Sequence, residues 1–218
     1  MTFTASARRL GIVSAVGTVL VSAAYAPVLI VGFFSLASSR QAMGDPVFAT
    51  LEILIVLSMP LMIGLIVAVH AWAAADLKAF SLIALVFVSL LAAVTTSVHF
   101  VLLTVGRQAA FPGQAWIPLF LSFTWPSVPY ALDILAWDVF FALCALFAAP
   151  VFGGTRLTNW IRVLLFVSGT LALAGLSGLV AGDMQLRNIG IAGYAGVFPI
   201  AALLLAILFQ RTPPQAAG

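Results

Sequence analysis

Six long apolar stretches occupy most of the 218-residue chain. A helix needs about 20 apolar residues to cross the hydrocarbon core of a bilayer. Short polar or Gly/Pro-containing segments separate the stretches, which we place at residues 10–36, 49–74, 79–105, 129–152, 158–181 and 188–210. The sequence therefore predicts an all-α, polytopic integral membrane protein, in which a bundle of six transmembrane helices forms a single transmembrane domain over residues 1–218.

The composition agrees with a membrane location and excludes several other classes of protein. Only 7% of the residues are charged, whereas soluble domains contain about 25%. The nine Lys and Arg residues are scattered along the chain, so we expect no nucleic-acid partner. The only cysteine, Cys144, excludes an intrachain disulfide bond and a Cys-based metal cluster.

The distribution of basic residues predicts the orientation of the chain in a cell membrane. Six spans place both termini on one side, where the flanking basic residues outnumber those on the other side by six to three. The first group comprises Arg8, Arg9, Lys78, Arg156, Arg162 and Arg211, and the second comprises Arg40, Arg107 and Arg187. Because cytoplasmic segments carry the excess of Lys and Arg, we expect both termini in the cytoplasm.

The first stretch has some features of a signal peptide. Arg8 and Arg9 precede it, and Ala24-Tyr25-Ala26 has the small-x-small pattern of a cleavage site. We nevertheless expect an uncleaved first span, because Pro27 would follow the cut and the apolar run continues to Leu36.

The longest connection, residues 106–128, is apolar and aromatic rather than polar. It contains Trp116, Trp125 and three prolines, and it is too short to cross the membrane. We expect it either to anchor the chain at the outer interface, where Trp is favoured, or to fold over the bundle as a lid.

Prolines and small residues predict features of the helix packing. Pro27, Pro60 and Pro199 lie inside the first, second and sixth spans, where each removes a backbone donor and favours a kink. Small residues recur at four-residue spacing in the last two spans, which we expect to pack closely. They are Ala174, Gly178 and Gly182 in the fifth span and Ala192 and Gly196 in the sixth.

Four ionisable side chains that interrupt the apolar spans are the most informative polar residues. Glu52 lies near the outer start of the second span, and His99 lies roughly 9 Å below the outer end of the third. Asp133 and Asp138 lie roughly 7 and 15 Å into the fourth span, so all four share one layer. Asp138 is the strongest functional candidate, because a carboxylate near mid-span costs about 2.5–3.5 kcal/mol on insertion scales. The two Asp residues would diverge by about 140° on an α-helix, so they should not share a face.

Neighbouring residues extend this candidate site. Thr95 shares a helix face with His99, and Tyr130 and Trp137 flank Asp133 in the same way. The catalytic candidates are Asp138, His99 and Asp133. The ligand-binding candidates are Glu52, Thr95, Tyr130, Trp137, Trp116 and Trp125.

Four interpretations of this cluster remain open. The side chains could form interhelical hydrogen bonds that only fix the packing. They could line an outward-facing pocket, in which carboxylates hold the polar or cationic part of a lipophilic ligand beside the aromatic connection. In one version of this pocket, a buried Asp protonates a double bond or an epoxide with His99 as its partner.

The remaining two interpretations are a proton or cation path and a divalent metal site. One His and three carboxylates could bind a metal ion, but the sequence has no HExxH motif and no i,i+4 ligand pair, so we predict no metal and no cofactor.

Other signals lie outside the cluster. His70 is expected near the cytoplasmic interface, and Lys78 lies in a loop, which excludes a retinal Schiff base within the membrane. The arginines of the outer side are expected to face outward, toward lipid phosphates.

The run Trp137-Asp138-Val139-Phe140-Phe141 places a carboxylate among aromatic residues. Over this one helix it resembles small membrane-bound isomerases and terpene cyclases, which protonate apolar substrates. The resemblance implies acid chemistry at Asp138.

The sequence thus favours a membrane protein whose outward-facing polar pocket binds a small lipophilic molecule and could convert it chemically. One alternative is a proton-coupled transporter of a small solute, and another is a structural or regulatory subunit without a ligand. The expected partners are membrane lipids, a lipophilic ligand and further copies of the chain in a homo-oligomer.

Overall fold

The computed structural model describes residues 3–36, 43–108 and 113–215. Its helices include six segments that are long and apolar enough to cross a membrane, and the described residues contain no strand. The segments are Ala5–Ser35, Val47–Trp72, Ala75–Arg107, Val128–Val151, Arg156–Ala181 and Met184–Arg211. The predicted all-α bundle of six spans is therefore confirmed, and the largest difference in bounds is at the first span, which begins at Ala5 rather than at residue 10.

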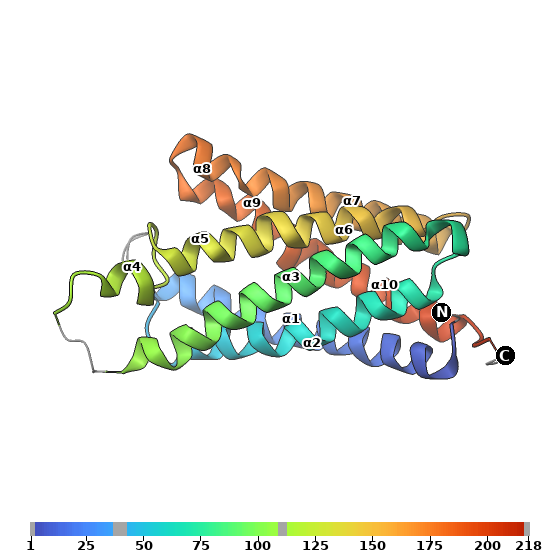
Figure 1. The fold of residues 1–218 in the computed structure, drawn as a ribbon, viewed down its shortest axis with the longest axis horizontal. Helices are drawn as coiled ribbons and strands as arrows, with labels where there is room; N and C mark the ends of the chain where they lie inside the picture. Colours follow the sequence, from blue (N-terminus) through green and yellow to red (C-terminus); the bar gives the residue numbers. More distant parts are fainter. Residues whose placement is uncertain (1–2, 37–42, 109–112, 216–218) are drawn as a thin grey trace.

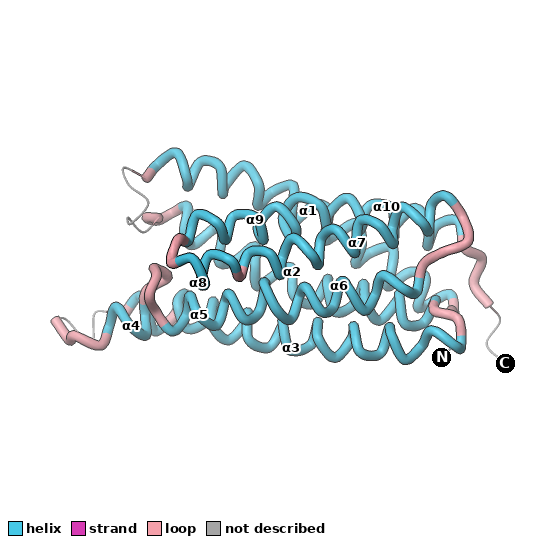
Figure 2. Tube along the Cα trace, turned by 90° about the horizontal axis from the view of Figure 1, so that it is seen from above, coloured by secondary structure: helices cyan, strands magenta, loops and turns pink. Residues whose placement is uncertain are grey.

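The spans run alternately up and down the bundle, and the loops lie at its two ends (Figure 2). α1 (Ala5–Ser35) packs against α2 (Val47–Trp72) and against α10 (Phe198–Arg211). α2 also packs against α3 (Lys78–Leu103), which follows the short turn η1 (Ala75–Leu77) and leads into η2 (Val105–Arg107). The connection to the fourth span carries one short helix, α4 (Ile117–Leu121).

The fourth span joins α5 (Val128–Ile134), η3 (Leu135–Phe141), α6 (Ala142–Ala148) and η4 (Ala149–Val151). The fifth joins α7 (Arg156–Gly175) and α8 (Ser177–Ala181). The sixth joins η5 (Met184–Arg187), α9 (Asn188–Ile191), η6 (Ala192–Val197) and α10. α3 and α7 pack on opposite sides of the fourth span, which makes it the most buried of the six.

Both termini lie at the same end of the bundle, which we call the proximal end (Figure 1). The backbone N–H of Gln215 donates to the carbonyl of Phe3 at 2.9 Å, and Nε of Arg8 donates to the carbonyl of Phe209 at 2.9 Å. The opposite end, where α4, α5 and α8 lie, is the distal end.

Two spans contain a π-helical segment in which the backbone hydrogen bonds reach five residues back. η3 is the π segment of the fourth span, and η6 is that of the sixth. Pro199 is the second residue after η6 and has no N–H to donate, which accounts for a local change in hydrogen bonding there. Pro27 and Pro60 lie inside α1 and α2, as predicted.

The fifth and sixth spans pack closely through glycines that differ in part from the predicted ones. A Cβ atom on Gly193 would lie 2.6 Å from the carbonyl oxygen of Ser168, and one on Gly175 would lie 3.2 Å from Cα of Gly190. The predicted Gly182 and Gly196 face open space. The predicted Gly178 does meet the sixth span, since its Cβ would lie 3.2 Å from the backbone nitrogen of Arg187. The spacing rule thus found the close pair of helices but only part of their contact, because spans that are apolar all round do not reveal their rotation.

Candidate functional site

Five ionisable side chains from four spans meet inside the distal half of the bundle. They are Glu52 of α2, His99 of α3, Asp133 of α5, Asp138 of η3 and Arg187 of η5. Each side chain is at most 7% exposed. We call these five residues the distal network. The four residues predicted to share a layer are thus brought together, and Arg187 joins them.

His99 links the second span to the fourth. Its Nδ1 lies 2.7 Å from Oε2 of Glu52, within hydrogen-bond distance. Its Nε2 lies 3.4 Å from Oδ1 of Asp133, which is close enough for an ion pair but lacks hydrogen-bond geometry. One imidazole ring therefore lies between two carboxylates.

Arg187 links the fourth span to the sixth. Its Nη2 donates to Oδ2 of Asp133 at 2.6 Å, and its Nε donates to Oδ2 of Asp138 at 3.0 Å. The guanidinium also lies over the ring of Tyr130, with Cζ 4.8 Å from the ring centroid. The prediction that Arg187 faces outward is wrong, because the sixth span begins at Met184 and carries Arg187 into the bundle.

The prediction that Asp133 and Asp138 do not share a helix face is also wrong. Both carboxylates contact the same guanidinium. η3 begins at Leu135, between the two residues, and each π-type hydrogen bond spans five residues instead of four. Residues five apart are therefore closer to one face than an α-helical wheel indicates.

Asp138 occupies a space that two glycines leave open. A Cβ atom on Gly190 would lie 2.6 Å from Oδ1 of Asp138, and one on Gly175 would lie 3.1 Å from the same oxygen. This Oδ1 is buried and has no hydrogen-bond partner among the described residues, and the same holds for Oγ1 of Thr95. Unpaired buried polar atoms are uncommon in native structures and call for an explanation.

The described residues contain no group of His, Cys, Asp and Glu arranged to hold a metal ion. The metal interpretation of the four acidic and His residues is therefore not supported. The guanidinium of Arg187, a permanent cation, contacts the carboxylates of Asp133 and Asp138 instead.

Aromatic residues of the long distal connection cover the network. The ring of Phe123 lies 5.6 Å from that of His99 and 5.2 Å from that of Tyr130, measured between centroids. Trp125 packs edge-on against Tyr130 at 6.0 Å but is 44% exposed, and Trp116 is 40% exposed at the start of α4. α4 lies at the distal extremity of the bundle (Figure 1), whereas the ring of Phe123 contacts the network through His99 and Tyr130. Whether the connection anchors the chain at the interface or acts as a lid stays a prediction.

A second aromatic group lies beside Asp138. Trp137 and Tyr194 pack at 4.9 Å, and Phe141 lies 5.9 Å from each ring. Trp137 and Tyr194 are half-buried, whereas Asp138 is fully buried. Tyr25 of α1, also half-buried, lies near Asp133, Glu52 and Arg187.

Sequence reasoning missed Arg187, Tyr25, Tyr194 and Phe123. Arg187 could have been found from charge alone, because buried carboxylates need a cation and few arginines lie at the matching depth. Nothing in the local sequence marks the aromatic residues as neighbours of the network.

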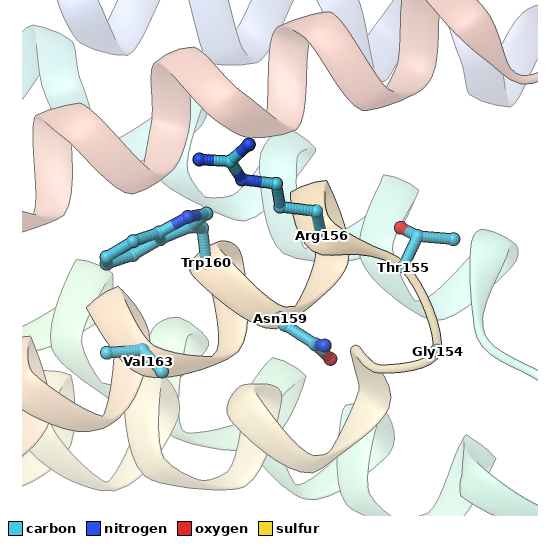
Figure 3. A pocket seen from close by; sticks show the side chains of 6 residues that line it. All are labelled: Gly154, Thr155, Arg156, Asn159, Trp160 and Val163. Carbon is cyan, nitrogen blue, oxygen red and sulfur yellow. The ribbon is translucent and has the colours of Figure 1, made fainter.

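Two hollows open at the proximal end, on the far side of the bundle from the network. The larger, of about 750 Å³, is bordered by Trp72, Lys78, Phe152 and Arg162 among other residues. The smaller, of about 400 Å³, lies at the start of α7, where Arg156 extends beside Trp160 (Figure 3). His70 is near this end and away from the network, as predicted, with Nδ1 2.9 Å from Oγ of Ser81.

The distal network is chemically unbalanced. It contains three carboxylic acids, one guanidinium and one imidazole, so full ionisation leaves a net charge of about −1 even when His99 is a cation. A buried net charge is costly, and a proton or a cationic group bound there would remove it.

Comparison with known proteins gives no match. No family model matches the chain, and neither a curated protein nor a solved structure is similar to it.

Proposed function

We propose that this multi-pass membrane protein binds the polar end of a small lipophilic molecule at the distal network. The observation that carries the proposal is the linked set of five buried ionisable side chains, with three acidic groups against two basic ones. Either a proton on one carboxyl group or a bound cationic group would neutralise the excess, and the proposal is that a ligand does so.

The charge balance defines the chemistry of the ligand. A head group that is cationic, or that donates a hydrogen bond, would neutralise or pair the excess carboxylate. Oδ1 of Asp138 is the best acceptor for it, because that oxygen is fully buried and has no partner among the described residues.

The aromatic groups around the network support an apolar ligand body. Trp137, Tyr194 and Tyr25 are half-buried, and Trp137 and Tyr194 pack against each other near the fully buried Asp138. Ligand pockets typically combine apolar and aromatic walls with a few convergent polar groups, and this region has both. A ligand would reach Asp138 past these rings or by displacement of Phe123.

Acid–base chemistry is the enzymatic version of this proposal. His99 contacts Glu52 and Asp133, whereas Asp138 contacts Arg187. Asp138 would therefore act as an acid held by the guanidinium, and the imidazole would not be its direct partner. Protonation of a double bond or an epoxide remains the reaction that fits such a site.

Proton-coupled transport is the second candidate, and the same charge excess favours it because one carboxylate of the network could carry a proton. A continuous path needs further groups toward the proximal end. Among the described residues, Asp76 in the short turn before α3 is the only acidic residue at that end. This makes transport the weaker candidate.

The orientation is part of the proposal. Arg187 belongs to the buried network, and Arg107 pairs with Asp45 at 2.6 Å. The distal end therefore exposes less positive charge than the sequence count implied, whereas the proximal end keeps its basic residues. The positive-inside rule then places the proximal end in the cytoplasm and the network in the outer half of a cell membrane.

The test is ligand-dependent thermal stability of the detergent-purified protein, with a panel of isoprenoids, membrane lipids and lipophilic amines. Asp138→Asn preserves the shape of the side chain and removes its charge. The matched control is Asp45→Asn, which removes an exposed distal carboxylate outside the network. We expect a compound that raises the melting temperature of the wild type and of the control but not of Asp138→Asn. If no compound distinguishes the wild type from Asp138→Asn, the network is a packing device and the proposal fails.

A further inference from the structure

The larger hollow at the proximal end has the features of a second ligand site. Its volume of about 750 Å³ lies within the range of small-molecule pockets. Its walls are formed by Phe3 near the start of the chain, the end of α2 with the turn into α3, residues 150–153 before α7, Arg162 of α7, and Gln215. It lies far from the distal network and is independent of the function proposed for that network.

The wall of the hollow is apolar and aromatic on one side. Trp72 and Phe152 stack with their ring centroids 5.3 Å apart, and Phe3 packs against Phe209 at 5.6 Å. Phe3 and Phe152 are buried, so this wall is a fixed part of the bundle.

Two cations complete the lining, and no acidic side chain belongs to it. Nζ of Lys78 donates to the carbonyl of His70 at 2.8 Å, which uses one of its three donors. Arg162 lies over the ring of Phe166, with Cζ 5.9 Å from the centroid. Neither cation has an acidic partner within ion-pair distance in the described part of the chain.

We propose that this hollow binds an amphiphilic anion. A phosphate or carboxylate head group would accept hydrogen bonds from Lys78 and Arg162, and the apolar part would lie against Trp72 and Phe152. Such an anion has two sources: the head group of an acidic phospholipid at the proximal interface, or a soluble anionic amphiphile.

The experiment measures binding by tryptophan fluorescence, because Trp72 lines the hollow. Dodecyl phosphate is titrated into the protein in neutral detergent, and Trp72→Phe identifies the part of the signal that comes from the hollow. In parallel, thermal stability is compared in nanodiscs of phosphatidylglycerol and of phosphatidylcholine.

The test variant is Lys78→Gln with Arg162→Gln. The matched control is Arg9→Gln with Arg211→Gln, which removes the same charge at the same end of the bundle but outside the hollow. We expect the test variant to lose at least about tenfold in affinity, because each removed contact is a charge-assisted hydrogen bond. The control should remain within about twofold of the wild type.

Stabilisation by phosphatidylglycerol that the test variant lacks would support the proposal with a lipid as the source. Binding of dodecyl phosphate without that lipid effect would support it with a soluble amphiphile. Absence of binding by either anion, or an equal loss in test and control variants, would overturn it. If the double variant does not fold, Arg162→Gln alone is the second variant. No hydrogen bond of the described structure depends on this exposed side chain. This variant should lose about tenfold in affinity for the anion.

Discussion

Replacement of Arg187 by Met should destabilise the protein more than any other single change of a charged residue. The side chain is 6% exposed and contacts two carboxylates, at 2.6 and 3.0 Å. Its removal leaves Asp133 and Asp138 without the cation that both contact. Removal of one partner of a buried ion pair lowers the free energy of unfolding by about 3–5 kcal/mol. Because Arg187 makes two such contacts, we expect a value in the upper part of that range.

The matched control is Arg107→Met. Arg107 also makes a short ion pair, at 2.6 Å from Asp45, but the two side chains are 39% and 56% exposed. An exposed pair contributes about 0–1 kcal/mol, so the control should lie in that range. The two variants remove the same residue type from the same end of the bundle and differ in burial.

The assay is reversible unfolding in mixed micelles, with the free energy of unfolding measured for each variant. A triple variant, Arg187→Met with Asp133→Asn and Asp138→Asn, should recover most of the loss, because removal of both sides of a buried ion pair is often neutral. The reasoning is refuted if Arg187→Met costs no more than Arg107→Met.

Two further pairs of substitutions test the packing of the sixth span. Gly190→Ala should cost about 1–3 kcal/mol in free energy of unfolding, since its Cβ would lie 2.6 Å from Oδ1 of Asp138; Gly196→Ala, which meets open space in the same span, should be neutral or stabilising. Ser168→Ala should cost about 0.6 kcal/mol, because its hydroxyl donates to a carbonyl of the sixth span at 2.9 Å. Ser89→Ala should cost less, because that exposed hydroxyl bonds only within its own helix. Equal effects within either pair would contradict the described packing.

The six spans were predictable because lipid imposes a simple requirement on sequence. Every backbone polar group must be satisfied within the membrane, so only long apolar helices cross it here. The depth of each ionisable residue follows from its position along a helix, which is why Glu52, His99, Asp133 and Asp138 could be assigned to one layer.

The partners within that layer could not be predicted, for two physical reasons. The spans are apolar all round, so the sequence does not fix how each helix is rotated. The π segment η3 then changes the relative direction of Asp133 and Asp138, and no sequence pattern marks where it begins.

The error on Arg187 has a different origin. Counting Lys and Arg by side treats every arginine near a span as a loop residue. Arg187 lies within one turn of the start of the sixth span, and its long side chain reaches the two carboxylates of the fourth. A requirement that each buried carboxylate have a cation would have assigned it to the network.

The central claim is that the unbalanced distal network holds a lipophilic ligand, and native mass spectrometry of protein purified from its membrane tests it most directly. We predict that the wild type and Asp45→Asn carry a bound lipophilic molecule of the same mass, and that Asp138→Asn has lost it. Identical spectra for all three proteins, with or without a bound molecule, would contradict the claim and leave the network with a structural role alone.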